Sequence, residues 1–182
     1  MQTTLRNDGK IETFARHEII PLKLDFFWLL KKGIVKTCTW NDEGAVITLG
    51  YWGSEDVVGQ PLSLVHPYRM ECLTPVEAFC IPVNQSHCLL DSIHRHIQQT
   101  EEMLYIVRSG KMYQRLRKML VWLSEKFGQE VEKGKLIKLR LTHQDLANTI
   151  GTTRVTVTKL MNQLEEEGVI FRTKRNGIVL CS

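Results

Sequence analysis

The segment 142–167 constrains the fold of this chain more than any other, because it holds two short helical patterns joined through one glycine, Gly151. Thr142 is a good N-cap for the first pattern, since its hydroxyl can accept a hydrogen bond from a free N–H group of the first turn. Asp145 follows three residues later, where a carboxylate interacts favourably with the same N–H groups. Gly151 can adopt the left-handed backbone of a tight turn. The segment therefore predicts a helix-turn-helix unit.

The second helix of this unit is rich in threonine and cationic residues near its start. Thr152 or Thr153 is expected to cap it. Its buried stripe is expected to contain Val155 or Val157, with Leu160, Met161 and Leu164. Arg154 and Lys159 lie five positions apart, so they leave the helix at different angles but can both enter one groove of a duplex. A surface helix hairpin without a ligand is the alternative, but acids crowd only the far end of this helix.

The residues after the second helix predict a β-hairpin. Gly168 ends the helix, 169–171 resemble a strand, and Asn176-Gly177 is a strong two-residue turn signal before 178–180. Three cationic side chains lie on this hairpin: Arg172, Lys174 and Arg175. The unit is therefore interpreted as a winged helix-turn-helix, with Lys174 and Arg175 as contacts to DNA phosphates. A solvated hairpin is the alternative for the wing charges taken alone.

The charge of the chain is unevenly distributed. Residues 1–107 contain nine Lys and Arg against 13 Asp and Glu, a net charge of −4. Residues 108–182 contain 15 against seven, a net charge of +8. This asymmetry is what a polyanion-binding half joined to a non-binding half would show.

The first half of the chain shows short apolar runs interrupted by turn residues. The runs 26–30 and 34–40 are separated by Gly33, and 41–44 form a turn signal before 45–49. Glycines and prolines punctuate the rest of this half: Gly53, Gly59, Pro61, Pro67, Pro75 and Pro82. The pattern predicts an antiparallel sandwich or roll. A metal-binding β-barrel enzyme is the competing interpretation, but no H-x-H pair with a downstream glutamate occurs in these strands.

A long helix is expected from about Ser86 to Arg108, where no proline or glycine occurs. Apolar positions alternate at spacings of three and four, and with one polar interruption they form the predicted dimer seam: Leu90, Ile93, Ile97, Thr100, Leu104 and Val107. Polar and charged residues flank this seam, which favours a dimerisation helix over a core helix packed against the β-rich half. Thr100 is expected to set the register or to contact a ligand. The following helix, 112–127, is expected to pack under the helix-turn-helix.

Other site chemistries find little support in the sequence. The five cysteines are widely spaced and form no C-x-x-C pair, so neither a zinc knuckle nor a redox dithiol is predicted. The six histidines lack obvious co-ligands, and no nucleophile–base pairing appears, so we expect neither a metal site nor an enzyme. No apolar run approaches a membrane span and no signal-peptide pattern opens the chain, so a cytosolic protein without membrane contact is expected.

With β-roll, long helix and winged helix in this order, the chain resembles the Crp/Fnr superfamily of bacterial transcription regulators over nearly its whole length. The most specific part is 141–170, which includes the string T-R-V-T-V-T at 153–158 and looks most similar to the cyanobacterial nitrogen-control branch. The resemblance assigns base reading to Arg154, Val155 and Lys159. It assigns phosphate contacts to four further residues: Thr142, Gln144, Thr153 and Thr156.

The effector site departs from the pattern that the resemblance implies. Nucleotide-sensing members have a glutamate after the β-roll glycine and an arginine shortly afterwards, whereas this chain has Gly59-Gln60 and then His66-Pro67. Pro67 has no N–H group to offer a cyclic phosphate, so cyclic nucleotide binding is not expected. A regulator that responds to 2-oxoglutarate is the alternative, because Arg69 and Arg95 supply positive charge for this acid. The candidate effector pocket therefore contains Gly59, Gln60, Arg69, Arg95 and Thr100, with an unknown effector and no predicted cofactor.

These observations predict an α+β fold in three parts: an abbreviated N-terminal antiparallel β-roll of the cyclic-nucleotide-binding type (1–85), a long dimerisation helix (86–109) and a C-terminal winged helix-turn-helix (110–182). The expected function is sequence-specific transcription regulation, by a homodimer that binds an inverted-repeat site in double-stranded DNA. The pair Arg154-Val155 suggests half-sites that begin GT(A). RNA polymerase is a further expected partner. A protein-interaction module of the same fold that has lost DNA binding is the alternative.

Overall fold

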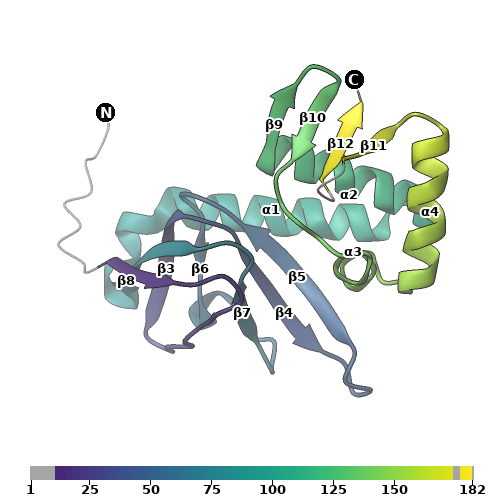
Figure 1. Cartoon of the computed structure of the whole chain (residues 1–182). Helices are drawn as coiled ribbons and strands as arrows, with labels where there is room; N and C mark the ends of the chain where they lie inside the picture. Colours follow the sequence, from purple (N-terminus) through teal and green to yellow (C-terminus); the bar gives the residue numbers. More distant parts are fainter. Residues whose placement is uncertain (1–10, 174–176, 182) are drawn as a thin grey trace. The chain divides into compact units, whose positions relative to one another are not determined.

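The computed structural model describes residues 11–173 and 177–181. Figure 1 shows the order of the elements along the chain. The internal contacts divide the chain into two compact units. One unit comprises the chain up to Asn41 together with Leu49–Glu101, and the other comprises Asp42–Thr48 together with the chain from Glu102 onward. The division passes through α1 (Leu90–Arg108), so this helix contributes to both units.

The first unit is built on two four-stranded sheets. One sheet has the order β1-β8-β3-β6, from β1 (Ile11–Phe14), β8 (Val76–Pro82), β3 (Phe26–Lys32) and β6 (Val57–Val58). The other has the order β2-β7-β4-β5, from β2 (Ile19–Ile20), β7 (Arg69–Cys72), β4 (Val35–Trp40) and β5 (Val46–Trp52). The pairings β1–β8, β3–β8, β3–β6, β2–β7 and β4–β7 are antiparallel. The predicted antiparallel β module is therefore confirmed.

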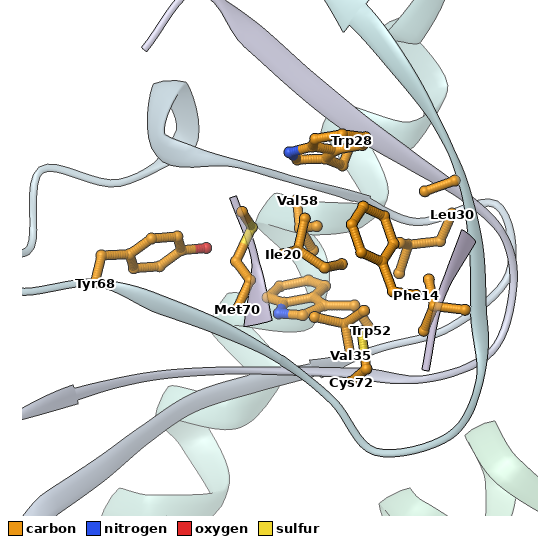
Figure 2. Packing of buried hydrophobic residues seen from close by; sticks show 12 residues of the cluster. Phe14, Ile20, Trp28, Leu30, Val35, Trp52, Val58, Tyr68, Met70 and Cys72 are labelled. Carbon is orange, nitrogen blue, oxygen red and sulfur yellow. The ribbon is translucent and has the colours of Figure 1, made fainter. Parts of the chain in front are cut away.

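The sequence of β3 is a continuous apolar run, not an alternating one, because both faces of this strand are buried. Trp28 and Leu30 belong to one buried cluster, whereas Phe27 and Leu29 belong to another. A strand that is buried on both faces needs apolar residues at every position. Figure 2 shows the first cluster, in which the rings of Phe14 and Trp28 meet edge to face with centroids 5.4 Å apart.

The long helix begins later than the sequence pattern predicts. The α-helix α1 starts at Leu90, and η2 (Val83–Leu89) precedes it as 3-10 turns that are interrupted at Gln85, where φ is −102° and ψ is 15°. The absence of proline and glycine in this stretch therefore did not extend the regular helix back to Ser86. A second short 3-10 turn, η1 (Gln60–Leu62), lies earlier in the described part of the chain and follows Gly59, whose φ is 147°.

In the second unit, α2 (Met112–Phe127) packs against the two helices of the helix-turn-helix, α3 (His143–Ile150) and α4 (Arg154–Glu166). Its buried face contains Leu116, Met119, Leu120, Trp122 and Leu123. Four strands form one sheet in the order β11-β12-β10-β9, from β11 (Ile170–Arg172), β12 (Ile178–Cys181), β10 (Gly134–Ile137) and β9 (Gly128–Val131). The predicted packing of 112–127 under the helix-turn-helix is confirmed.

The hairpin of β9 and β10 was not predicted from the sequence. Every residue of β9 is exposed, so its sequence Gly-Gln-Glu-Val lacks the apolar alternation that signals a strand. Ile137 in β10 is buried, and β10 pairs with both β9 and β12. The hairpin therefore extends the two-stranded wing to a four-stranded sheet. Among the described residues, no helix has the length and apolar character needed to cross a membrane.

Candidate nucleic-acid interface

The first helix of the helix-turn-helix begins with a reciprocal capping box. The Thr142 hydroxyl accepts a hydrogen bond from Asp145 N at 3.0 Å, and Asp145 Oδ2 accepts one from Thr142 N at 3.0 Å. The same carboxylate oxygen accepts from Thr142 Oγ1 at 2.6 Å. Two free N–H groups are satisfied in this way, which fixes where α3 begins.

The turn between the two helices depends on Gly151. Its φ of 72° and ψ of 51° lie in the left-handed region, and its N–H donates to Ala147 O at 3.0 Å. A Cβ at this position would meet nothing within 4 Å, so the requirement for glycine comes from the backbone and not from space. Thr153 then caps α4, with its hydroxyl accepting from Thr156 N at 3.2 Å. The structure thus selects Thr153, not Thr152, as the cap.

The helix α4 separates its apolar and polar residues onto two faces. Val157, Met161 and Leu164 are buried. On the other face Arg154 and Lys159 are exposed, and Val155 is 64% exposed. The sequence alone allowed either Val155 or Val157 to be the buried valine. Because the helix begins at Arg154, the buried one is Val157. The three side chains expected to read bases are therefore all accessible.

The predicted phosphate-binding residues of this unit lie at the starts of its two helices. Thr142 and Gln144 are exposed at the start of α3, where the Gln144 amide donates to Asn148 Oδ1 at 2.7 Å. The hydroxyls of Thr153 and Thr156 are 3.0 Å apart at the start of α4. N–H groups at helix starts and nearby hydroxyls are donors that suit phosphate oxygens. Their role in phosphate binding stays a prediction.

A histidine that the sequence analysis did not select connects the two helices. His143 Nδ1 lies 2.8 Å from Thr158 Oγ1 on α4. Partial burial of the ring lowers the His143 pKa below its usual range, and the positive charges of Arg172 and Arg154 lower that pKa further. No local pattern indicates this contact, because the two residues are 15 positions apart in different helices.

The wing is attached to α4 through Arg172 at the end of β11. Glu165 Oε2 accepts a hydrogen bond from Arg172 Nε at 2.7 Å and a second, shorter one from Arg172 Nη2. The Arg172 guanidinium also donates to Asn162 Oδ1 at 2.9 Å. Arg172 therefore binds its own chain as well as adding charge to the hairpin. The other two predicted wing cations, Lys174 and Arg175, lie outside the described residues.

Comparison with known proteins decides the family. The model of the Crp-like helix-turn-helix domain matches residues 114–182. The regulatory protein CysR of Synechococcus elongatus is 39% identical to this chain over 170 residues, which cover 91% of this chain and 81% of that protein. The chain belongs to the Crp/Fnr family of transcription regulators.

Two further similarities agree with this membership. The global nitrogen regulator of Synechocystis is 34% identical over 187 residues, with coverage of 91% of this chain and 82% of that protein. A crystal structure of a CRP-family transcriptional regulator from Thermus thermophilus superposes with a TM-score of 0.80 at 20% identity, over 94% of this chain and 92% of the other, which supports the fold. This Crp/Fnr protein is a DNA-binding transcription regulator and not an enzyme. The resemblance to the cyanobacterial branch is confirmed by the first two relatives.

The residues of the candidate effector pocket of this Crp/Fnr protein have partners within their own chain. The Arg69 guanidinium lies over the Trp40 ring, 4.3 Å from its centroid. Arg95 Nη2 donates to Glu55 O at 2.6 Å. Thr100 Oγ1 donates to His96 O at 2.7 Å, one turn back along α1. Gln60 Nε2 donates to Ser63 O at 2.9 Å, close to Gly59 at the start of η1. A common pocket for these five residues stays a prediction.

The predicted dimer seam on α1 is divided between outward and inward positions. Leu90, Ile97 and Leu104 repeat every seven residues and are 54%, 53% and 55% exposed. Thr100 is also exposed, whereas Val107 is half-buried and Ile93 packs against the cluster of Phe27 and Leu29. The helix is therefore partly a core helix, as the alternative interpretation proposed. It also has a stripe of exposed apolar side chains. We call Leu90, Ile97 and Leu104 the α1 stripe.

The cysteines differ in their accessibility. Cys38 and Cys72 are buried, Cys80 and Cys181 are partly exposed, and Cys88 is exposed; all five are free thiols. At its partly exposed position the Cys80 sulfur lies 3.5 Å from Lys23 Nζ. Within residues 11–173 and 177–181, no group of three His, Cys, Asp or Glu side chains is arranged to hold a metal ion.

Proposed function

We propose that this regulator binds an inverted-repeat DNA site as a homodimer, with one α4 helix in the major groove of each half-site. The observation that carries this proposal is the separation of faces on α4, where Arg154 and Lys159 are exposed while Val157 and Met161 anchor the helix in the unit. A helix-turn-helix dimer of this kind reads half-sites about one helical turn apart.

The base contacts follow from the chemistry of the three exposed residues at the start of α4. Arg154 reads a guanine, because its guanidinium can donate two parallel hydrogen bonds to O6 and N7. Val155 packs on a thymine methyl group, and Lys159 contacts a neighbouring base. This arrangement gives half-sites that begin GT(A).

The phosphate contacts come from the ends of the two helices and from the wing. Thr142 and Gln144 bind the backbone at the start of α3, and Thr153 and Thr156 do so at the start of α4. Lys174 and Arg175 add charge from the wing. These contacts hold the register of the protein on the duplex and are independent of base sequence.

Dimerisation through the α1 stripe supports this mode of binding. Leu90, Ile97 and Leu104 lie on one line of the helix at a heptad spacing, and such a line is buried when two helices pair. Thr100 lies beside the stripe and sets the register at a polar position. The dimer then delivers two α4 helices to one inverted repeat.

The regulator acts in the cytoplasm, where its DNA and RNA polymerase are found, and without a cyclic nucleotide. Gln60 and Pro67 support the second statement, since the chain has an amide for a carboxylate at the first position and lacks an N–H group at the second. Arg69 and Arg95, the residues that a 2-oxoglutarate response would use, lie against the Trp40 ring and the Glu55 carbonyl in the free chain.

Fluorescence anisotropy with a labelled inverted repeat tests the proposal. Binding should be tighter to the GT(A) repeat than to a scrambled duplex of equal length. It should also weaken on raising salt, with a log–log slope of about −0.9 for each phosphate contact. Equal affinity for both duplexes would contradict sequence-specific binding. No binding to either duplex at low salt would favour a protein-interaction module that has lost DNA binding.

A further inference from the structure

The hydrogen bond between His143 and Thr158 fixes which ring nitrogen is protonated. Thr158 Oγ1 donates its only hydrogen to Arg154 O at 2.9 Å. The same oxygen must therefore accept from His143 Nδ1 at 2.8 Å, so Nδ1 bears a proton. In the neutral ring the lone pair is then on Nε2, and Nε2 makes no hydrogen bond to any of the described residues.

The ring lies among positive charges from two other elements. Arg154 on α4 and Arg172 on β11 both act on His143, and Glu165 neutralises part of the Arg172 charge. Burial of the ring and the two guanidinium groups lower the His143 pKa, so the ring is neutral in the free protein at neutral pH.

We propose that His143 is a binding site for a DNA backbone phosphate and gains a proton at Nε2 when the duplex binds. The inference rests on the proposed function, because it places the cluster of His143, Arg154 and Arg172 against DNA. His143 lies between Thr142 and Gln144, the two residues of α3 assigned to the phosphate backbone. The proton comes from solvent, and the new Nε2–H donates to a phosphate oxygen.

The arrival of a phosphate reverses the electrostatics of the cluster. A negative charge beside the ring favours the imidazolium, whereas the two guanidinium groups alone disfavour it. The bound complex therefore holds more protons than the free protein and free DNA, so binding tightens as the pH falls. For one proton the association constant should rise by up to about tenfold per pH unit between the free and bound titration midpoints. With close to one proton taken up per half-site near pH 7, we expect a rise of more than about tenfold per half-site between pH 8 and pH 6.

Calorimetry in two buffers of different ionisation enthalpy measures this proton directly. The wild-type protein should take up close to one proton per half-site near pH 7, and His143→Gln should take up none, since glutamine can still donate to Thr158 but cannot titrate. His143→Lys carries a fixed charge and should bind with little dependence on pH. His94→Gln, a change at an exposed histidine on α1, is the control and should behave as wild type.

The outcomes separate this inference from the proposed function. Equal proton uptake by the wild type and His143→Gln would overturn the inference while leaving DNA binding intact. Specific binding by the wild type without proton uptake would overturn it as well. If His143→Gln did not fold, the titration of the His143 ring, followed by NMR in free and DNA-bound wild type, would decide, and an unchanged midpoint would contradict the proposal. Failure of the wild type to bind DNA at either pH would overturn the proposed function and the inference together.

Discussion

Glu165 on α4 holds Arg172 on β11 by three hydrogen bonds. Glu165 Oε2 accepts from Arg172 Nε at 2.7 Å and also from Nη2, and Glu165 Oε1 accepts from Arg172 N at 3.2 Å. One carboxylate thereby ties both the backbone and the side chain of Arg172, in the first wing strand, to α4. The wing is thus attached to α4, the helix that we propose enters the groove, through the Glu165 carboxylate.

Removing the charge of Glu165 should weaken DNA binding without changing base preference. We expect Glu165→Gln to reduce affinity about two- to fivefold for all sequences alike, since an exposed ion pair contributes little but the wing loses its position. The Arg172 contact lowers the Glu165 pKa, so its stabilising contribution is present above the unfolded-state pKa and is lost as the pH falls through the folded-state value. Glu166→Gln, a change at the exposed neighbouring acid, is the control for anisotropy and for acid unfolding.

Arg154→Ala should remove one base preference. We expect a loss of about 1–3 kcal/mol in binding to the GT(A) repeat, together with relaxed preference at one base pair of each half-site. Competition with duplexes that carry each substitution in turn measures this preference. If the variant weakened all duplexes equally, Arg154 would be a phosphate contact instead of a base reader.

The turn before α4 should tolerate asparagine better than alanine. Gly151→Ala places a side chain at a φ of 72°, which destabilises the fold by about 1–2 kcal/mol even though a Cβ there meets no other atom. Gly151→Asn should lose less, because asparagine adopts left-handed backbone more readily. Urea unfolding compares the two variants. Equal stability of both to the wild type would show that the turn does not need this conformation.

A charge on the α1 stripe should dissociate the dimer. Ile97→Glu puts a carboxylate at the centre of the apolar line formed with Leu90 and Leu104, where pairing would bury it. Sedimentation velocity should then show a monomer, with weaker binding to the inverted repeat. Gln98→Glu adds the same charge at the next exposed position and should leave the dimer intact. An unchanged sedimentation coefficient for Ile97→Glu would place the interface elsewhere.

The thiols should react in the order of their exposure. Burial, followed by the charges of Glu18 and Glu71, raises the pKa of Cys72 to about 12, so this thiol stays protonated and unreactive in the folded protein. Cys88 is exposed and should label first with iodoacetamide at pH 8, whereas Cys38 and Cys72 should label only in denaturant. Mass spectrometry of digested peptides measures the order. Rapid labelling of Cys72 under native conditions would contradict the buried packing of β7.

The sequence predicted the helix-turn-helix well because its signals are local. The capping box of Thr142 and Asp145 and the glycine of the turn each act within four residues, so they are visible in the chain before it folds. The long helix α1 was harder to place. Heptad spacing identified the exposed positions Leu90 and Ile97, but it could not show that Ile93 packs into the first unit's own core.

The parts that escaped prediction depend on contacts between elements. The β9 strand is exposed along its whole length, so it has no hydrophobic period to detect. The bonds from His143 to Thr158 and from Glu165 to Arg172 join separate elements, and nothing in either local sequence specifies the partner. The choice between Val155 and Val157 was also open until the N-cap at Thr153 fixed the phase of α4.

The number of chains bound to each duplex shows whether this regulator reads DNA as a homodimer. Native mass spectrometry of the full chain with a duplex that carries the GT(A) inverted repeat, at low ionic strength, measures how many chains bind. We expect a complex of two chains and one duplex, which Arg154→Ala should largely abolish on this sequence. A single chain per duplex, or a spectrum with only free duplex and free protein, would contradict it.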